Sequence, residues 1–250
     1  MNEWTKILDN GGSIDSVYMD FMKAFDKVPH KRLIQKMERY GINNKTINWV
    51  SNFLTDRKQK VSVNGAEPIS HGVTSGIPQG SVLGHILFVI YINDMPDHVD
   101  AEAYLFTDDT KVYKEIKTQT DTTSLQKDLD NLHEWSDKWL LKFHPNKCKV
   151  MTASNKRGNN REQKYHLYDS EGKEIELQNS DGEKDIGVLV DDQLNYSQHI
   201  QQKIKANSIM GLIRRTFTYP NEHNFKYLLD HILNTPQLFD RHTSSMTLTA

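Results

Sequence analysis

Two adjacent carboxylates, Asp108 and Asp109, stand between two short runs that have the pattern of β-strands. Ala103 to Phe106 precedes them, and Thr110 to Tyr113 follows with alternating polar and apolar residues. Like charges side by side at a strand end must be neutralised by a raised pKa, a basic partner or a cation. Mg²⁺ suits such a place because it binds one or two carboxylates together with water and phosphate oxygens. The pair therefore predicts a phosphate-handling metal site at a hairpin tip.

The competing interpretation is ordinary turn chemistry, and the chain supplies its own comparison in Asp191 and Asp192. This second pair also follows an apolar run, Val188 to Val190, and it precedes a helix expected to start near Ser197. Because Asp is common in turns and at helix caps, capping or turn chemistry is enough to explain it. Only the surrounding residues can distinguish the two pairs.

Two upstream segments favour a catalytic role for the first pair. The alternating run from Val17 to Phe21 predicts a strand that presents Asp20 near its end. Residues Ser75 to Gly80 form a glycine-rich loop whose backbone amides suit a phosphate or a base. Metal-assisted phosphoryl transfer needs carboxylates from separate strands around two cations, which an antiparallel sheet joining Asp20 to the hairpin would supply.

The elements that must position these residues follow from periodicity and turn signals. We expect a helix ending at Asn10 to Gly12, two packing helices opened by Pro29 and by Asn43, and a strand from Arg57 to Val63. The apolar segment Ser81 to Asn93 predicts a helix under a sheet. After a polar link from Thr118 to Ser124, we expect these further elements: a helix over 125–141 with Trp135 and Trp139 in the core, an edge strand over 147–151, a loop over 154–163, strands over 165–168, 174–177 and 186–190, a basic helix from 197, and a helix over 225–232.

Bulk properties exclude several classes of protein. The 250-residue chain has a formal charge of −2, so any nucleic-acid surface must be local. A single cysteine, Cys148, excludes an internal disulfide and fits a reducing compartment. The apolar run Ile86 to Ile92 is too short to span a bilayer, and no signal peptide is visible, so we expect an intracellular protein with no targeting segment and no membrane partner. The candidate nucleic-acid-binding residues, which a solvated face explains as well, are Arg57, Lys58, Lys60, Lys203, Lys205, Arg214 and Arg215.

Three stretches in this order resemble successive motifs of the reverse transcriptases of non-LTR (LINE-type, jockey-like) retrotransposons. They are Tyr18 to His30, Ser75 to Gly84 and Phe106 to Asp109, and the similarity continues through Trp135 to Met151 and from Ile186 to about Arg215. The resemblance implies an α+β fold, a right-hand polymerase palm with a central antiparallel sheet packed on helices, a partial thumb and most of the fingers missing. It also implies an RNA-directed DNA polymerase that extends a primer 3′ hydroxyl.

The resemblance also assigns roles to single residues. Asp20, Asp108 and Asp109 match the catalytic, metal-binding acids, with the Phe21 main-chain carbonyl as a further metal ligand, and Lys147 matches a possible general acid near the triphosphate. Phe25 matches the side chain under the incoming sugar that excludes a 2′ hydroxyl, and Gln79 and Gly80 match the loop that touches template and nucleotide. Ile186 to Val188 resemble the start of the primer-gripping region. The implied cofactors are two Mg²⁺ ions, or Mn²⁺ in their place.

By the same resemblance, the partners are an RNA template, a DNA primer and deoxynucleoside triphosphates, in the nucleus or the cytoplasm, with no oligomeric state indicated. We expect a palm over 1–190 with a partial fingers insertion at about 30–70, the start of a thumb over 191–234, and a disordered tail over 235–250. Thr107 stands where the family usually has Ala, and His85 where it has Pro. The fingers segment that precedes the first acid has no counterpart here. The alternative is an inert palm remnant that at most binds nucleic acid.

Overall fold

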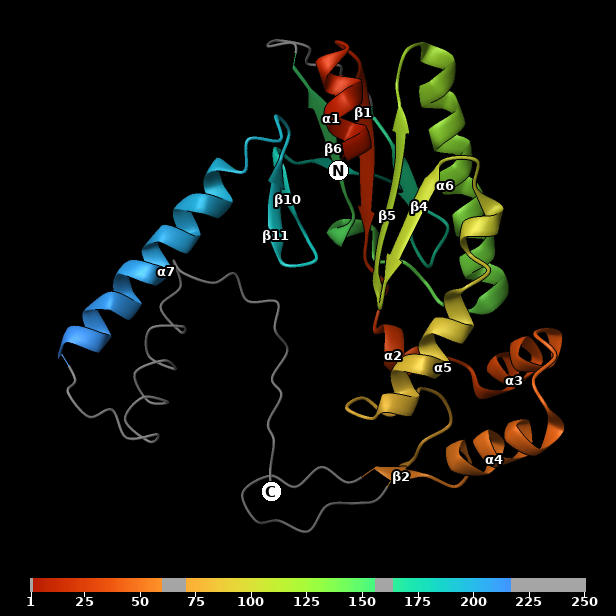
Figure 1. Ribbon diagram of the computed structural model, residues 1–250. Helices are drawn as coiled ribbons and strands as arrows, with labels where there is room; N and C mark the ends of the chain where they lie inside the picture. The colour runs from red at the N-terminus through yellow and green to blue at the C-terminus, as the bar shows by residue number, and fades with distance from the viewer. Residues whose placement is uncertain (1, 60–70, 156–163, 217–250) are drawn as a thin grey trace.

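The computed structural model describes residues 2–59, 71–155 and 164–216, and a five-stranded sheet lies at its centre (Figure 1). The strand order is β4-β5-β1-β6-β9, with bounds Glu102–Phe106, Asp109–Glu115, Ser13–Met19, Lys149–Ser154 and Gln178–Asn179. Every pairing is antiparallel except the short one between β6 and β9. The central antiparallel sheet expected from the sequence is therefore confirmed.

Helix α6 (Gln119–Trp139) lies along one face of this sheet (Figure 1). The other helices of the larger core lie beyond the ends of β4 and β5, and they are α2 (Ala24–Lys27), α3 (His30–Arg39), α4 (Asn44–Leu54) and α5 (Val82–Ile92). Val17 and Val112 point into this core from the strands, and Trp135 and Trp139 enter it from α6, as expected. Because side chains alternate along a strand, the neighbours of Val17 and Val112 point to the opposite face.

That opposite face is covered by α1 (Asn2–Asp9) and by the hairpin of β10 (Gly182–Asp185) and β11 (Val188–Asp191). Trp4 and Val190 pack there on Tyr113, and the Trp4 and Tyr113 rings meet edge to face at 5.1 Å. Beyond β11, α7 (Ser197–Thr216) projects away from the sheet (Figure 1). Two further short hairpins join β2 (Lys58–Gln59) to β3 (His71–Gly72) and β7 (His166–Tyr168) to β8 (Glu174–Glu176).

A buried cation ties α3 to α5 and α6. The Lys36 side chain is 1% exposed, and its Nζ pairs with an Asp94 carboxylate oxygen at 2.5 Å and donates to the Tyr91 carbonyl. The ammonium also lies 3.9 Å from the centre of the Trp139 ring and 4.7 Å from that of Trp135, whose indole N–H donates to Asp94. Burial lowers the pKa of Lys36 to about 8, against the opposing effect of Asp94.

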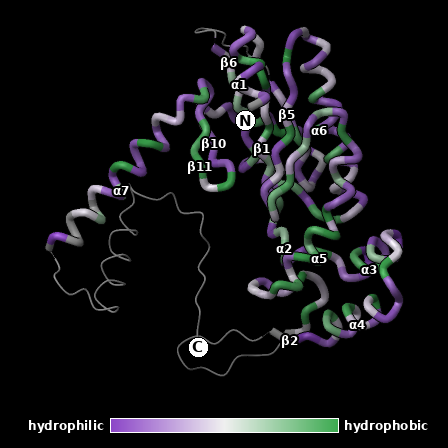
Figure 2. The backbone as a smooth tube through the Cα atoms, viewed as in Figure 1, coloured by the Kyte–Doolittle hydropathy of each residue, from purple (hydrophilic) through white to green (hydrophobic). Residues whose placement is uncertain are grey.

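Three sequence expectations about these elements are wrong. The polar stretch after Thr118 is the first part of α6, because Thr118 and Asp121 form a reciprocal capping box that starts the helix at Gln119. β6 is not an edge strand, since it lies between β1 and β9. Figure 2 shows α5 as largely hydrophobic, yet the helix is only half covered: Val82, Ile86 and Val89 are 81%, 51% and 49% exposed.

Several expectations fall outside the described residues. These are Lys60 and the second half of the strand expected from Arg57 to Val63, most of the loop over 154–163, the helix over 225–232 and the tail over 235–250. Within residues 2–59, 71–155 and 164–216, no helix has the length and apolar character needed to cross a bilayer.

Candidate functional site

The two carboxylate-bearing segments meet at one end of neighbouring strands. Met19, the last residue of β1, pairs with Thr110 of β5, so Asp20 follows directly across from Asp109. On the other side of β5, Asp109 pairs with Phe106 and closes the β4–β5 hairpin around Thr107 and Asp108. The sheet register therefore brings the acids predicted from separate motifs, Asp20, Asp108 and Asp109, to a single strand end.

Burial and the neighbouring acids change the ionisation of Asp109. Partial burial at the strand ends raises the pKa of Asp109, and the negative charges of Asp108, Asp20 and Asp185 raise it further. Asp185 reaches the site from β10 and forms an ion pair with Lys111 of β5. This fourth acid was missed by sequence reasoning, because only the packing of the β10–β11 hairpin brings it near the strand end. The site holds an excess of negative charge, which a cation would relieve.

Lys147 lies beside Asp20, the first of the predicted acids. It ends the 3₁₀ turn Pro145–Lys147, and its Nζ is 2.9 Å from an Asp20 carboxylate oxygen. The backbone fixes this neighbourhood, because the His144 N–H donates to the Asp20 carbonyl at 2.8 Å. About half of the Lys147 side chain is exposed, so its ammonium group remains accessible from solvent.

The hairpin tip is held by Thr107 in an unusual backbone conformation. Its φ of 53° lies in the left-handed region, which is costly for a β-branched residue. The Thr107 hydroxyl lies 2.7 Å from the Phe106 carbonyl and 3.1 Å from the Asp108 Oδ1. The hydroxyl that distinguishes this chain from the Ala usual at this position in the resembled motif thus orients one of the candidate metal ligands.

Phe21 and Phe25 are packed by the core that lies under the site. The Phe21 ring stacks on Phe143 with centroids 4.6 Å apart, which leaves its main chain next to Asp20. Phe25 is 9% exposed and stacks on Phe88 of α5 at 4.7 Å. His85 meets the Phe25 ring edge to face at 5.4 Å. Through these ring contacts, α2 packs against the first half of α5, next to the glycine-rich loop.

The glycine-rich loop is attached to α2 by its backbone. The Gly76 N–H donates to the Val28 carbonyl at 2.9 Å, and the Ile77 N–H donates to the Phe25 carbonyl at 2.8 Å. A Cβ on Gly76 would lie 2.7 Å from the Asp26 carbonyl oxygen, so only glycine allows this approach. The Gly76 carbonyl in turn lies 2.8 Å from His30 Nε2, a contact that no sequence signal indicated.

Gln79 and Gly80, the predicted contacts of template and nucleotide, lie in the exposed part of the loop. Gly80 has a φ of +80°, and the space that a Cβ would occupy there is open. The helix that follows is capped by Ser81, whose Oγ accepts from the Gly84 N–H at 3.0 Å. The second half of the loop is therefore exposed, while its first half is anchored.

The predicted basic residues do not gather in one place. Arg57 lies over the Phe53 ring at the end of α4, and Lys58 is exposed in β2. On α7, Lys203, Lys205 and Arg215 are exposed. Lys60 and the side chain of Arg214 fall outside what the structure describes. The two basic segments belong to different elements, the end of α4 with β2 and the helix α7.

The carboxylate site fits a divalent cation by its donor chemistry. Asp20, Asp108 and Asp109 offer hard oxygen ligands, and partial burial together with the charges of Asp108 and Asp20 raises the pKa of Asp109. Across the described residues, no three His, Cys, Asp or Glu side chains are already close enough together to enclose a metal ion. The acids are therefore neighbours without forming a finished coordination shell. By contrast, Asp191 accepts from the Gln193 and Asn195 N–H groups, which confirms turn chemistry for the second acidic pair.

Comparison with known proteins gives consistent results. The family described as reverse transcriptase (RNA-dependent DNA polymerase) matches residues 6–228. The chain is 31% identical over 199 residues to the RNA-directed DNA polymerase from mobile element jockey of Drosophila melanogaster, covering 73% of this chain and 20% of that protein. It is 28% identical over 197 residues to the jockey polymerase of Drosophila funebris, covering 74% of this chain and again 20% of the relative. The chain thus spans about a fifth of the length of these curated relatives.

Among solved structures, a telomerase from Candida tropicalis in complex with a fragment of telomeric RNA has a similar fold. The TM-score is 0.53 with 12% sequence identity, and the match covers 79% of this chain and 32% of the telomerase chain. At this identity the likeness concerns the fold alone. It agrees with a polymerase palm built on a central antiparallel sheet.

Proposed function

Because the chain belongs to the reverse transcriptase family, we propose that it carries the palm of an RNA-directed DNA polymerase from a non-LTR retrotransposon. The reaction joins a deoxynucleoside triphosphate to the 3′ hydroxyl of a primer paired with an RNA template. The observation that carries the proposal is the register of β1 and β5, which sets Asp20 across from Asp109 at the tip of the hairpin. The overall match of the chain to the family supports the same assignment.

Asp20, Asp108, Asp109 and the Phe21 main-chain carbonyl would hold two Mg²⁺ ions, or Mn²⁺ in their place. When bound, the ions would supply charge neutralisation at the attacking and leaving oxygens of the phosphoryl transfer. The chain itself contributes the spacing of these acids, which the sheet register fixes. Thr107 contributes the orientation of Asp108 through its hydroxyl.

Lys147 is proposed to act on the leaving group. In the transfer, the primer 3′ oxygen forms a bond to the α-phosphorus while the bond to the β-phosphate oxygen breaks and pyrophosphate departs. Lys147 stands at Asp20 with its side chain about half exposed, so its ammonium group can reach a phosphate held at the same acid. Its positive charge would stabilise the departing pyrophosphate, and its proton could pass to it.

The nucleotide-facing roles are proposed for the neighbouring segments. Phe25 would support the sugar of the incoming nucleotide from its position on α2, and its stacking on Phe88 keeps its ring in place. Gln79 and Gly80 would touch template and nucleotide from the exposed part of the loop. The hydrogen bonds of Gly76 and Ile77 to the α2 segment keep this loop beside Phe25.

The proposed division of the chain follows these roles. Residues 1–190 would form the palm, with a partial fingers insertion at about 30–70, and residues 191–234 would begin a thumb. The basic residues of α7 would then face nucleic acid held above the sheet, through phosphate contacts that weaken with salt. Residues 235–250 remain predicted to be a disordered tail.

Primer extension on an RNA template tests the proposal directly. We would compare the parent chain with Asp108→Asn in Mg²⁺ and all four deoxynucleotides. Asp192→Asn is the matched control, because Asp192 also adjoins another Asp at the end of a strand. We expect extension by the parent and by Asp192→Asn, and a loss of at least about 100-fold in Asp108→Asn.

Two outcomes would contradict the proposal. Equal extension by Asp108→Asn and the parent would remove the hairpin from catalysis. No extension by any folded form, together with metal-independent RNA binding that weakens steeply with salt, would favour the inert palm remnant.

A further inference from the structure

An exposed pair of aromatic rings lies on α4, away from the carboxylate site. Trp49 is 57% exposed, and its ring stacks on that of Phe53 with centroids 6.0 Å apart and planes inclined by 16°. The core contacts of this helix are made by other residues, Ile47, Val50 and Leu54, which are all buried. The Trp49 indole is therefore not needed to pack the helix, and one of its faces is open to a planar ligand.

The stack continues into a basic residue. The Arg57 guanidinium carbon lies 5.7 Å from the centre of the Phe53 ring, so Trp49, Phe53 and Arg57 form a column of three planar groups along α4 and its C-terminal end. Lys45 lies one helical turn before Trp49 on the same stripe, and exposed Lys58 follows Arg57. Three cations against the single exposed acid Asp56 make this surface locally basic on a chain whose net charge is −2.

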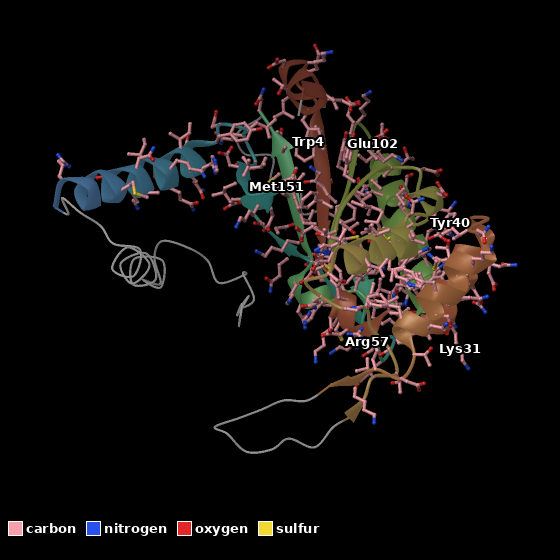
Figure 3. The ribbon with its side chains drawn as sticks, turned by 60° about the horizontal axis from the view of Figure 1, so that its bottom comes forward. Trp4, Lys31, Tyr40, Arg57, Glu102 and Met151 are labelled. Carbon is pink, nitrogen blue, oxygen red and sulfur yellow. The ribbon has the colours of Figure 1, made fainter. Side chains whose placement is uncertain are left out.

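The column is also connected to the glycine-rich loop. The Val73 N–H donates to the Arg57 carbonyl at 2.8 Å, and β2 pairs with β3 immediately beyond Arg57. Val73 precedes the first residue of the loop, Ser75, by two positions. Figure 3 labels Arg57 where α4 ends and the chain turns into β2. A nucleic-acid strand reaching the loop from this side would pass the two rings and then Arg57.

We propose that the surface formed by Trp49, Phe53 and Arg57 is a stacking platform for unpaired bases of a single-stranded nucleic acid. Nucleobases stack on aromatic faces whatever their sequence, and flanking Arg and Lys side chains bind the phosphates between them. An apolar protein segment docked on the same face would use the rings but would leave the cations without partners. The direction of the strand, from the platform to Gln79 and Gly80, rests on the proposed polymerase function. Binding itself does not.

Tryptophan fluorescence gives a direct test, because Trp49 is the exposed one of four tryptophans. Trp4, Trp135 and Trp139 are 2%, 1% and 3% exposed. We would titrate the parent chain with an oligouridylate of about 12 nucleotides in EDTA, without nucleotides. Stacking on Trp49 predicts quenching of the solvent-exposed emission. In Trp49→Phe, this quenching should vanish while affinity, measured by anisotropy of a labelled oligonucleotide, stays within about threefold of the parent.

Three variants separate stacking from charge. Trp49→Ala should weaken binding of the labelled oligouridylate roughly 5- to 100-fold and leave the salt dependence of the affinity unchanged. Arg57→Gln should lower the slope of log affinity against log salt by about 0.7. Tyr40→Ala is the matched control, since Tyr40 is an aromatic residue that is 43% exposed at the end of α3 and should not affect binding.

Unchanged affinity in folded Trp49→Ala would overturn the platform and would leave a protein contact as the explanation of the exposed rings. Equal affinity for a duplex of the same length would also overturn it, because paired bases cannot stack on the indole. Neither result depends on catalysis. If Asp108→Asn abolishes primer extension while Trp49→Ala binds normally, the polymerase assignment survives and the platform fails. If Asp108→Asn extends primers as the parent does while Trp49→Ala binds weakly, the platform is supported and the polymerase assignment is rejected.

Discussion

Replacement of either member of the buried pair Lys36 and Asp94 should have very different effects on stability. Burial lowers the pKa of Lys36 from 10.5 to about 8, which corresponds to about 3 kcal/mol at about 1.4 kcal/mol for each pH unit. The folded protein bears this free energy to keep the ammonium charged at neutral pH. The Asp94 carboxylate partly offsets the cost of burying the Lys36 ammonium. Asp94→Asn removes this compensation and should lower the free energy of unfolding by about 3 kcal/mol at pH 7.

Lys36→Met should change the free energy of unfolding by less than about 1 kcal/mol. A methionine fills the space among the Trp135, Trp139 and Tyr91 rings without a charge, and it makes favourable contacts with aromatic rings. Asp94 is 25% exposed and keeps the Trp135 N–H, so its carboxylate tolerates the loss of the lysine. The double variant should therefore recover most of the stability that Asp94→Asn loses.

The same pair predicts a pH dependence with a definite sign. Between pH 8 and 10.5, folded Lys36 releases its proton while the unfolded chain retains it. The unfolded state then binds more protons, so stability rises with pH across this window, by up to about 3 kcal/mol relative to Lys36→Met. Below pH 8 both states are protonated and the difference is constant.

Urea unfolding followed by circular dichroism, at pH 7 and pH 9.5, measures all four forms. The comparison of the parent with Lys36→Met removes the tyrosines and other groups that titrate in both. Equal destabilisation by Lys36→Met and Asp94→Asn would refute the reasoning. It would mean that the attraction between Lys36 and Asp94 contributes more to the free energy of unfolding than the cost of burying the cation. A flat difference between the two pH values would refute the lowered pKa of Lys36.

Three further predictions concern single positions. Gly84→Ala should destabilise the protein by at least about 2 kcal/mol in urea unfolding, because the added Cβ would lie 2.2 Å from the Pro78 carbonyl oxygen. Gly80→Ala should destabilise it by only about 1 kcal/mol, because the space for a Cβ is open there and only the φ of +80° is unfavourable. Asp109→Asn should abolish primer extension yet leave thermal stability at neutral pH equal or higher. The pKa of Asp109 is higher in the folded than in the unfolded protein, so stability falls as the pH rises through the folded-state pKa and the ionised carboxylate is unfavourable at neutral pH. Burial raises the pKa of the Cys148 thiol to about 12, so a thiol reagent should label this cysteine only as urea unfolds the chain, and rapid labelling of the native protein would contradict its burial.

Much of the sheet was predictable because period and turn chemistry agree there. The alternation through Thr110 to Tyr113 predicted β5, and the acid pair marked the turn. Asn43 caps α4 at the expected place, with its side chain accepting from the Lys45 N–H. In these segments local preference and tertiary packing favour the same conformation.

Other features depended on contacts that no local pattern records. The segment Thr118 to Ser124 is polar because the start of α6 is capped and largely exposed to solvent. In sequence, such a polar segment looks like a linker. The exposed face of α5 cannot be read from composition, since its apolar residues surround the helix on all sides while the protein covers only part of it. Asp185 and His30 joined the site through packing and hydrogen bonding with residues far away in sequence.

The central position of β1 in the sheet sets an order for folding during synthesis. Its two neighbours arise late, since Ile14 pairs with Glu115 on one side and with Ala153 on the other. At about 5 to 20 residues per second, a ribosome needs on the order of 10 s to release β6 after β1. Until β5 emerges, both edges of β1 are unpaired, and one edge then stays open to a chaperone or to another nascent chain until β6 follows. Asp20 can meet the hairpin only after β5 has emerged, so a chain interrupted before that point carries the first acid and no site.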